Sequence, residues 1–458
     1  MKKIAILFAL AMVAGGIVWA QTTPPTPSFP SPGYGRLGFV NLKAVKPGSI
    51  ESRSSAGIFL SDVDTFIDPR FHNPQIGTFL YAGSIISSST SSANASFGFA
   101  RNVGDLYLAF DYYGSLVDAR GYKQQEVAGD DPSPESKYSY SSWYSYFSVL
   151  LGIAGMGIRL DARVPTRTEK EREVGKDDTG ATVDNLGRKV EYAPSVALTW
   201  GTKMGDLAPW ARVGYRFPEV NEQDYKSVSG GDTVATYRKL TQNAAFELSG
   251  GAEYALGEGA VGGELNLGLT LPAKLKTSAK GANPAPEAKD KMGGRIGAGV
   301  SAYYSREFDF GSGVKLGFKP NAGFAITTGS NSVEGDSGSQ LSTGDRYTTL
   351  DLGVNMGITW QVGQKVAVFG GTSLRAFDWT TWVRTGESQA AEGADKQKGD
   401  SSWRVTGFSG MTPRIGMTFT PAENITVGLN LMEFIDGLFG YGSTTYRPAF
   451  DFVVSAKL

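Results

Sequence analysis

From about residue 76 onward, apolar and polar residues alternate along the chain with a period of two. In residues 261–271 the apolar positions are odd-numbered, and Glu264, Asn266 and Thr270 lie between them. In residues 350–360 the even positions are apolar and oppose Asp351 and Asn355. A period of two predicts strands with one apolar face. The runs extend over roughly 10 to 18 residues, whereas soluble strands average about 5–6 and membrane-crossing strands about 9–11.

The breaks between these runs are of two kinds that alternate along the chain. Seven short turns rich in Gly, Asp, Asn and Pro are expected at Arg101–Asp105, Gly152–Gly157, Lys203–Leu207, Gly257–Ala260, Glu307–Gly313, Val362–Lys365 and Thr420–Asn424. Six long polar loops are expected at Asp118–Ser139, Thr166–Gly187, Pro218–Arg238, Ala273–Asp290, Thr328–Asp345 and Arg384–Ser401. Short turns at one end and long loops at the other are typical of outer-membrane barrels, with the turns in the periplasm.

This pattern predicts an all-β fold, a transmembrane antiparallel up-and-down barrel of about sixteen strands. Seven hairpins give fourteen strands, an opening strand near Gly77–Ser87 adds one, and a terminal strand after the loop Gly437–Arg447 adds another. Because single-chain bacterial barrels have even strand numbers, fourteen is the alternative. Closure is required because it leaves no backbone edge unpaired in lipid.

The last nine residues alternate to the end of the chain, with Phe450 and Phe452 on one face and Asp451 on the other. They are similar to the terminal strand signal that the barrel-assembly machinery reads in outer-membrane proteins. That resemblance implies the assembly machinery as a partner, although this chain ends on Leu458 rather than on Phe.

Composition supports strands with one lipid face and one water face. The chain has 60 Gly, 25 Phe and 20 Tyr, yet its mean hydropathy is only −0.19. Its net charge of −1 gives no basic excess for nucleic acid. The absence of cysteine excludes disulfides and thiolate chemistry.

The N-terminus has the features of a cleaved export signal. Lys2 and Lys3 precede an apolar stretch that ends at Trp19, and Ala20 closes a small-residue cleavage pattern. A membrane anchor is the alternative, but a proline-rich segment follows instead of a charged stop. We therefore expect a signal peptide at 1–20, an N-terminal periplasmic or lumenal segment at 21–75, and the barrel at 76–458, in the bacterial outer membrane.

Aromatic residues on the parity interpreted as lipid-facing fall at the strand ends. Those beside the short turns are Trp200, Tyr254, Tyr304, Trp360 and Phe419, and those beside the long loops are Tyr192, Phe217 and Trp403. Amphipathic rings at strand ends are typical of the aromatic girdles at the two lipid interfaces.

The opposite parity would place many charged residues in the lumen. Acidic candidates are Asp111, Asp161, Glu191, Glu247, Glu253, Glu264, Asp351 and Asp451. Basic candidates are Arg159, Arg163, Arg212, Arg216, Arg295, Lys315, Lys319, Arg375, Arg404 and Arg414. They would either line a channel for polar solutes, with a slight basic excess favouring anions, or hold the wall together as ion pairs.

Glycines within the strands fall mostly on the same inward parity, for example Gly317, Gly357 and Gly371. They would either make room for a constriction loop or plug to pack against the wall, or allow a large barrel to curve.

Some 55 residues, Gln21 to Gln75, precede the first predicted strand. Just before it, Asn73 and Pro74 resemble the Asn-Pro-Ala element in the N-terminal hatch of long-chain fatty-acid (FadL-type) transport barrels, with Gln75 replacing Ala. The resemblance implies a hatch that gates the uptake of hydrophobic compounds. Asp62, Asp64 and Asp68 lack the Gly and Glu of a calcium loop and are expected to be solvated turn carboxylates.

The sequence contains no pattern typical of an enzyme, a cofactor or a metal site. Its one histidine, His72, precedes the predicted barrel, and there is no phosphate-binding or dinucleotide fingerprint. The leading hypothesis is a channel for small polar solutes, and as porins are often trimers a homotrimer is one expectation for its assembly. FadL-like hydrophobic uptake and a surface or adhesion protein acting through its loops are the alternatives.

Overall fold

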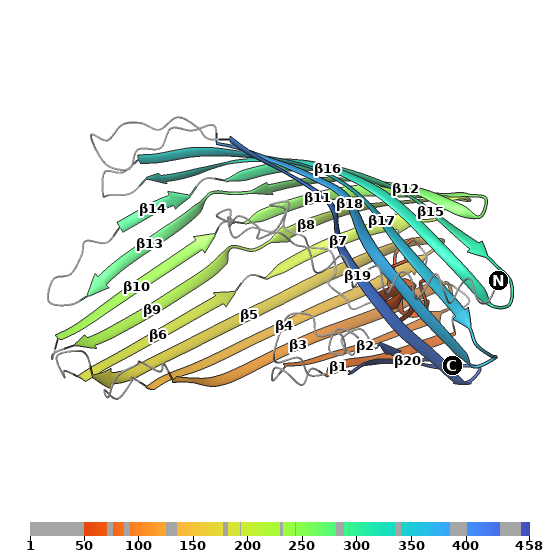
Figure 1. Cartoon of the computed structure of the whole chain (residues 1–458), viewed down its shortest axis with the longest axis horizontal. Coiled ribbons are helices and arrows are strands. Elements are labelled where there is room, and N and C mark those ends of the chain that lie inside the picture. Colours follow the sequence, from red (N-terminus) through yellow and green to blue (C-terminus); the bar gives the residue numbers. More distant parts are fainter. Residues whose placement is uncertain are drawn as a thin grey trace.

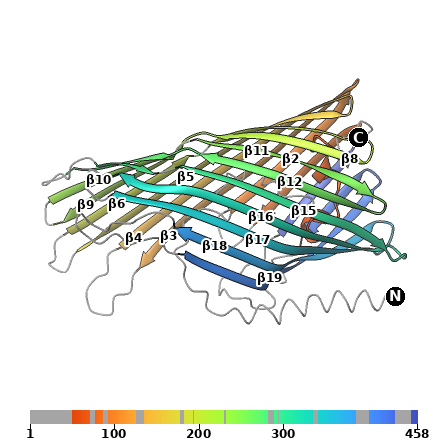
Figure 2. The same cartoon turned by 90° about the horizontal axis from the view of Figure 1, so that it is seen from above.

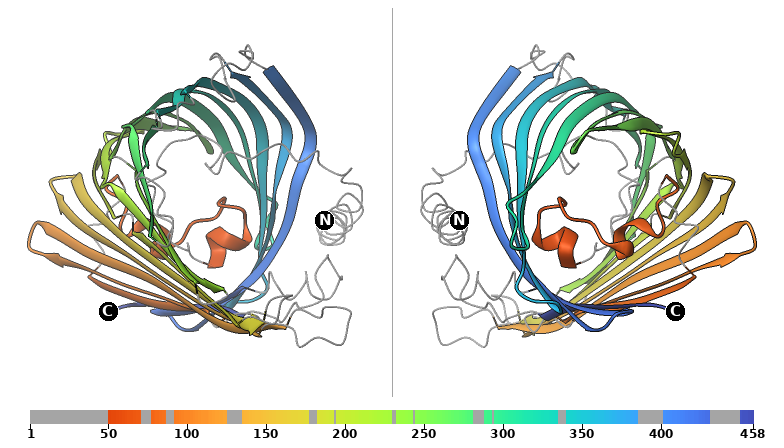
Figure 3. Two further views of the ribbon diagram at one scale, coloured as in Figure 1. Left: turned by 90° about the vertical axis from the view of Figure 1, so that its left-hand side faces the viewer. Right: turned by 90° about the vertical axis from the view of Figure 1, so that its right-hand side faces the viewer.

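The computed structural model describes residues 50–70, 77–86, 92–124, 135–176, 182–192, 194–229, 232–242, 244–280, 288–292, 294–334, 340–384, 401–430 and 450–458. Its strands form one antiparallel sheet that curves into a ring (Figures 1 and 3). The sheet closes because β1 (Thr78–Ile86) pairs with β21 (Phe450–Lys457), with Leu80 opposite Ala456 and Ser84 opposite Phe452. The barrel therefore has no open edge.

Between these two strands each strand pairs with the next along the chain. The uninterrupted ones are β2 (Ser92–Val103), β3 (Leu106–Gln124), β4 (Glu135–Ile153), β5 (Met156–Lys176), β16 (Val314–Glu334), β17 (Gln340–Gln361), β18 (Val366–Arg384), β19 (Ser401–Ala422) and β20 (Ile425–Asn430).

Five strands are interrupted along their length. Their two parts are β6 (Thr182–Tyr192) with β7 (Ser195–Thr202), β8 (Leu207–Arg216) with β9 (Glu219–Ser229), β10 (Asp232–Gln242) with β11 (Ala245–Leu256), β12 (Gly259–Thr270) with β13 (Ala273–Lys280), and β14 (Ala288–Met292) with β15 (Arg295–Asp309). Both parts keep the same neighbours, so the 21 segments make sixteen strands. The predicted strand number is confirmed.

Proline accounts for three of these interruptions. Pro194, Pro218 and Pro272 lie between the two parts of their strands, and a proline has no N–H to donate to a neighbouring strand. The wall nevertheless stays joined there, since Phe217 N donates to Pro194 O at 2.9 Å and Leu271 N donates to Ala244 O at 3.0 Å.

One end of the barrel carries all seven predicted short turns, and we call it the turn end. Several turns use left-handed glycines, such as Gly104 with φ 62° and Gly155 with φ 78°. The last strand also finishes there, since Leu458 N donates to Thr78 O at 2.8 Å.

The prediction of long loops at the opposite end was wrong for most of their length. Residues 118–124 and 135–139, for example, belong to β3 and β4, and the predicted loops at 166–187, 218–238, 273–290 and 328–345 are likewise largely strand. Figure 2 shows β6, β9 and β10 reaching the end far from the C-terminus. Strand pairing requires only backbone groups, so a polar composition does not end a hairpin. Loops 437–447 and 385–400 lie outside the described residues.

Two short helices lie inside the ring near the turn end, α2 (Ile50–Ser54) and α3 (Asp62–Thr65) (Figure 3). Ala56 and Gly57, both with positive φ, make the turn after α2. Ser61 and Asp64 form a capping box on α3. Among the helices described, none is long and apolar enough to cross a membrane. We call residues 50–70 the lumenal segment.

Candidate functional site

The outer surface of the barrel is apolar, and the inner surface is not. In β7, Val196, Leu198 and Trp200 are exposed, whereas Ser195, Ala197 and Thr199 between them are buried. The predicted aromatic residues follow the exposed parity. Trp200, Tyr254, Trp360 and Phe419 near the turns, and Tyr192, Phe217 and Trp403 farther along, are exposed, and Tyr304 is half-buried.

A closed sheet with apolar side chains on its outside is stable in hydrocarbon, because every strand is paired and the exposed face is soluble in lipid. This chain is an outer-membrane β-barrel. Its lumen is therefore the candidate functional site.

One face of the lumenal segment packs tightly against the first strands of the barrel. Phe66 is only 1% exposed and packs against Phe79 and Tyr81, with ring centroids 5.3 and 5.4 Å away. Tyr107 donates its hydroxyl to the Phe66 carbonyl at 2.6 Å. Gly98 faces the Phe66 and Tyr81 rings, where a Cβ would collide with both.

The same face continues along β5 and β7. Arg159 Nη1 donates to the Ile67 carbonyl at 3.2 Å, and Pro69 lies on Gly157 so closely that a Cβ there would be 2.5 Å from the Pro69 carbonyl oxygen. Arg70 lies on Gly201 and pairs with Asp68 at 2.8 Å. Burial alone would lower the pKa of the Arg70 guanidinium, but the hydrogen bond and charge of Asp68, with the charge of Glu253, raise it.

On the opposite wall, too, the lumenal segment packs against inward glycines. Ser55 lies against Gly357 and Gly371, and Ile58 lies against Gly317 and Gly357. The interpretation of inward glycines as space for a packed segment is thus confirmed at these three positions. Gly262 and Gly323 instead make room for side chains of the neighbouring wall strands, Tyr303 and Asp351.

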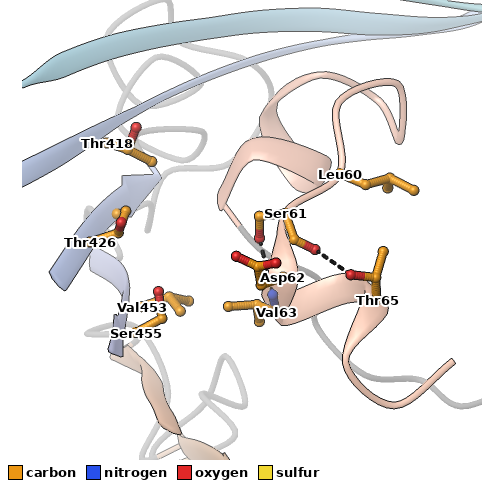
Figure 4. A pocket seen from close by; sticks show the side chains of 10 residues that line it. Leu60, Ser61, Asp62, Val63, Thr65, Thr418, Thr426, Val453 and Ser455 are labelled. Atoms are coloured by element: carbon orange, nitrogen blue, oxygen red, sulfur yellow. Dashed lines mark hydrogen bonds between the residues drawn. The ribbon is translucent and has the colours of Figure 1, made fainter. Parts of the chain in front are cut away.

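A cavity of about 330 Å³ separates α3 from β19, β20 and β21 (Figure 4). Leu60, Asp62 and Val63 line it on one side, and Thr418, Thr426 and Ser455 on the other. Figure 4 shows the Asp62 and Val63 side chains turned toward the strands. Beside the cavity, Lys457 Nζ lies 2.6 Å from Asp62 Oδ2, and these side chains are 57% and 38% exposed.

Asp161 is the centre of a polar cluster in the wall beneath the tightly packed face. Its side chain is about 3% exposed and accepts from Tyr146 at 2.7 Å and from Ser148 at 2.6 Å. Arg159 and Arg212 pair with it at 3.1 and 3.2 Å. The cluster is what the ion-pair interpretation of the inward charges predicts.

The register sets four of the predicted arginines around two predicted acids. On either side of β7, Arg159 and Arg212 both lie opposite Thr199, and Arg163 and Arg216 both lie opposite Ser195. Asp161 lies between these two levels on β5, and Glu247 lies at the same height beside β8. Arg163 also stacks over the Tyr144 ring at 4.9 Å.

The remaining candidates are spread over the lumen rather than gathered in one place. Asp111 accepts from Tyr81, Glu253 from Tyr303, and Glu264 from Asn266 at 3.3 Å.

Lys319 stacks over the Tyr303 ring at 4.0 Å. Arg414 donates to the Arg53 carbonyl at 3.3 Å, and Arg375 pairs with Asp378 at 3.3 Å.

Lys315 is exposed at the turn end, and Arg295, Asp351 and Arg404 are partly buried. The side chains of Glu191 and Asp451 lie outside the description, as do residues 71–76 with His72 and the hatch candidates Asn73 and Pro74. Contact of any of these residues with a solute stays a prediction.

Sequence reasoning missed Asp378, which is 4% exposed and also accepts from Thr380 at 3.1 Å. The register of β17 and β18 shifts between Leu352 and Gly353, which reverses the parity of β18 beyond Arg375. A bulge of this kind has no signal in simple alternation. The buried inward tyrosines Tyr81, Tyr107 and Tyr146 were missed too, because only aromatic residues on the lipid-facing parity were considered.

The three aspartates of the lumenal segment each have a structural partner. Asp64 caps α3, Asp68 pairs with Arg70, and Asp62 pairs with Lys457. Within the residues that the structure describes, no group of three or more His, Cys, Asp or Glu side chains is placed to hold a metal ion.

Comparison with known proteins finds similar barrels among solved structures. No protein-family model matches this chain, and no curated protein matches it. A FadL homologue of Pseudomonas aeruginosa is 8% identical with a TM-score of 0.36, and the match covers 90% of this chain and 98% of that one. The monoaromatic hydrocarbon channel CymD is 8% identical with a TM-score of 0.35, covering 90% and 97%. The toluene transporter TodX of P. putida is 8% identical with a TM-score of 0.33, covering 90% and 98%.

Proposed function

We propose that this barrel is a gated outer-membrane transporter and that its lumenal segment closes the periplasmic end. The observation that carries the proposal is the position of residues 50–70. Their described contacts reach β1, β3, β5 and β7 on one side and β16 to β19 and β21 on the other. Because short turns lie in the periplasm in such barrels, this is the end at which a solute would leave.

A gated barrel of this kind differs from a permanently open porin. A sixteen-stranded barrel encloses a water-filled channel unless something fills it. A segment seated on inward glycines, through both backbone and side chains, fills space that a freely diffusing solute would need. Passage then requires the lumenal segment, or part of it, to move.

For the solute we propose small hydrophobic or aromatic compounds. The inward face above the lumenal segment carries aromatic pairs, with Tyr113 and Tyr144 at 5.9 Å and Tyr347 and Trp382 at 6.5 Å between ring centroids. Such pairs offer flat apolar surfaces to a passing molecule. The charged wall around Asp161 and Arg212 favours a second candidate, the passage of small polar solutes.

Two linked measurements test these proposals. Single-channel conductance in KCl would be recorded for the purified mature protein and for a variant that lacks residues 21–70. We expect a low conductance for the intact protein and a large, stable one after deletion. An equally large conductance in both would support an open porin, and none in either would support a surface protein.

The solute class is tested in cells that lack their own porins. We expect the intact protein to support growth on a monoaromatic compound as carbon source more than growth on a sugar of similar mass. The reverse preference would favour the polar-solute channel.

We also propose that residues 1–20 are removed on export. Mass spectrometry of the protein purified from outer membranes, with Gln21 as the expected first residue, tests this directly.

A further inference from the structure

The contact between the lumenal segment and the wall is unequal around the ring. Toward β1, β3, β5 and β7, the side chains of Phe66 to Arg70 are in direct contact with the wall. Toward β19, β20 and β21, the cavity of about 330 Å³ lies between the wall and the segment from Leu60 to Thr65. This volume is within the range of small-molecule sites, which begins at about 300 Å³. Val63, which is buried with Val453, and Asp62, which is paired with Lys457, still join this segment to β21.

The lining of the cavity has a definite chemical character. Val63 and Val453 present apolar carbon, and Thr418, Thr426 and Ser455 present hydroxyl groups that both donate and accept (Figure 4). Among the lining residues that the structure describes, Asp62 is the one with a charged side chain, and it is already paired with Lys457. A charged solute would meet no opposite charge that lacks a partner, whereas an uncharged molecule with an apolar body and a hydroxyl would be matched.

We propose that this cavity is the exit site of the transport path. A small uncharged molecule with an apolar part and at least one hydrogen-bonding group binds there before it reaches the periplasm. The inference rests on the proposed function and adds the route, which passes between α3 and β19 to β21 while Phe66 to Arg70 stay in place.

The Asp62–Lys457 pair stands beside this route and is easily broken. Both side chains remain substantially exposed, at 38% and 57%, and exposed ion pairs contribute only about 0–1 kcal/mol. Val63 and Val453 belong to the same buried cluster as Phe66, so separation of residues 60–65 from β21 breaks this pair and exposes the two valines, while the rings around Phe66 stay packed. The whole lumenal segment does not have to leave the barrel.

The absence of cysteine makes the site directly testable. Thr426→Cys and Ser455→Cys each place a single thiol in the cavity, and Ser305→Cys places a control thiol. Ser305 is a half-buried residue opposite Ala260 near the turn end of β15, outside the cavity lining. The rate of reaction with a charged methanethiosulfonate would be measured in the full-length protein, alone and with p-cresol or benzoate.

We expect p-cresol to slow the reaction several-fold at Thr426→Cys and Ser455→Cys and to leave Ser305→Cys unchanged, with benzoate having no effect on any of them. Equal slowing at all three, or none at the two cavity positions, would overturn the site. Protection by benzoate as strong as that by p-cresol would overturn the class of ligand.

The route is tested by attaching a bulky thiol adduct and recording uptake of p-cresol by intact cells. We expect the adduct at Thr426→Cys to abolish uptake and the same adduct at Ser305→Cys to leave it unchanged. If deletion of residues 21–70 opens a conductance while the Thr426→Cys adduct has no effect, the proposed function stands and the route is wrong. If deletion opens no conductance, the proposed function itself fails.

Discussion

The lumenal segment contacts the barrel through two sides of different chemistry. On the first side, toward β1 to β7, Phe66 lies among Phe79 and Tyr81. Tyr107 donates to the Phe66 carbonyl and Arg159 to the Ile67 carbonyl. On the second side, toward β19 to β21, a cavity and one exposed ion pair lie beside the buried Val63 and Val453, and Arg414 donates to the Arg53 carbonyl. We call these the packed side and the cavity side.

The two sides therefore differ in how strongly they hold the lumenal segment in the barrel. Burying a side chain as large as Phe66 contributes about 1.5–3 kcal/mol from its apolar area alone, whereas an exposed ion pair contributes about 0–1 kcal/mol. A fluctuation of modest cost should therefore separate the cavity side first. The packed side keeps the segment in the barrel, and the cavity side allows passage.

The largest effect is expected for Phe66→Ala, which removes the centre of the packed side. Loss of a buried phenylalanine costs about 3–5 kcal/mol, so the free energy of opening of residues 50–70 should fall by that amount. Native-state hydrogen exchange of the backbone amides measures it. Leu60→Ala is the matched control, because Leu60 is 58% exposed and should change little.

Gly157→Ala tests whether the packed side depends on close backbone approach. Its Cβ would lie 2.5 Å from the Pro69 carbonyl oxygen, so we expect overpacking to cost about 1–3 kcal/mol. Gly407→Ala is the control, since its nearest atom would be at an ordinary 3.9 Å. The same exchange measurement should show increased opening for Gly157→Ala alone; equal effects would contradict the seating on glycine.

Tyr107→Phe removes a single hydrogen bond from the packed side. The hydroxyl donates to the Phe66 carbonyl at 2.6 Å, and such a bond contributes about 0.5–1.5 kcal/mol. Hydrogen exchange of the backbone amides in the lumenal segment should accelerate by the factor that corresponds to this loss, and exchange in the barrel strands should not change. No change at residues 66–70 would mean that the bond does not hold the segment.

The smallest effect is expected for Lys457→Gln on the cavity side. Loss of the exposed pair with Asp62 should lower the opening free energy by about 0–1 kcal/mol, and only for residues 60–65. The effect should also shrink at high salt, because the Debye length falls from about 10 Å at 0.1 M to 3 Å at 1 M. Acceleration of exchange across residues 66–70 as well would contradict the independence of the two sides.

The outline of the barrel could be predicted from sequence because alternation and turn residues are local signals. The seven short turns and the opening and closing strands follow from them, and so does the strand number. The extent of the hairpins could not be predicted, because backbone pairing continues where the apolar pattern stops, as in residues 166–176 of β5. Which residues of β18 beyond Arg375 face the lumen could not be predicted either, because a bulge shifts the register there and has no signal in the composition.

The lumenal segment was harder to predict. Its contacts join residues far apart in the chain, such as Arg53 with Arg414 and Ile67 with Arg159. The inward glycines were a signal for its position, since Gly317, Gly357 and Gly371 do mark where the segment lies. Neither the cavity nor the Asp62–Lys457 pair had any signal, because both depend on how α3 is placed against β19 to β21.

The most direct test of the account is the single-channel conductance of the intact mature protein compared with that of the variant lacking residues 21–70. The account predicts brief, low-conductance openings for the intact protein and a large, continuous conductance for the variant. An intact protein that conducts as continuously and as strongly as the variant would show that residues 50–70 do not close the barrel.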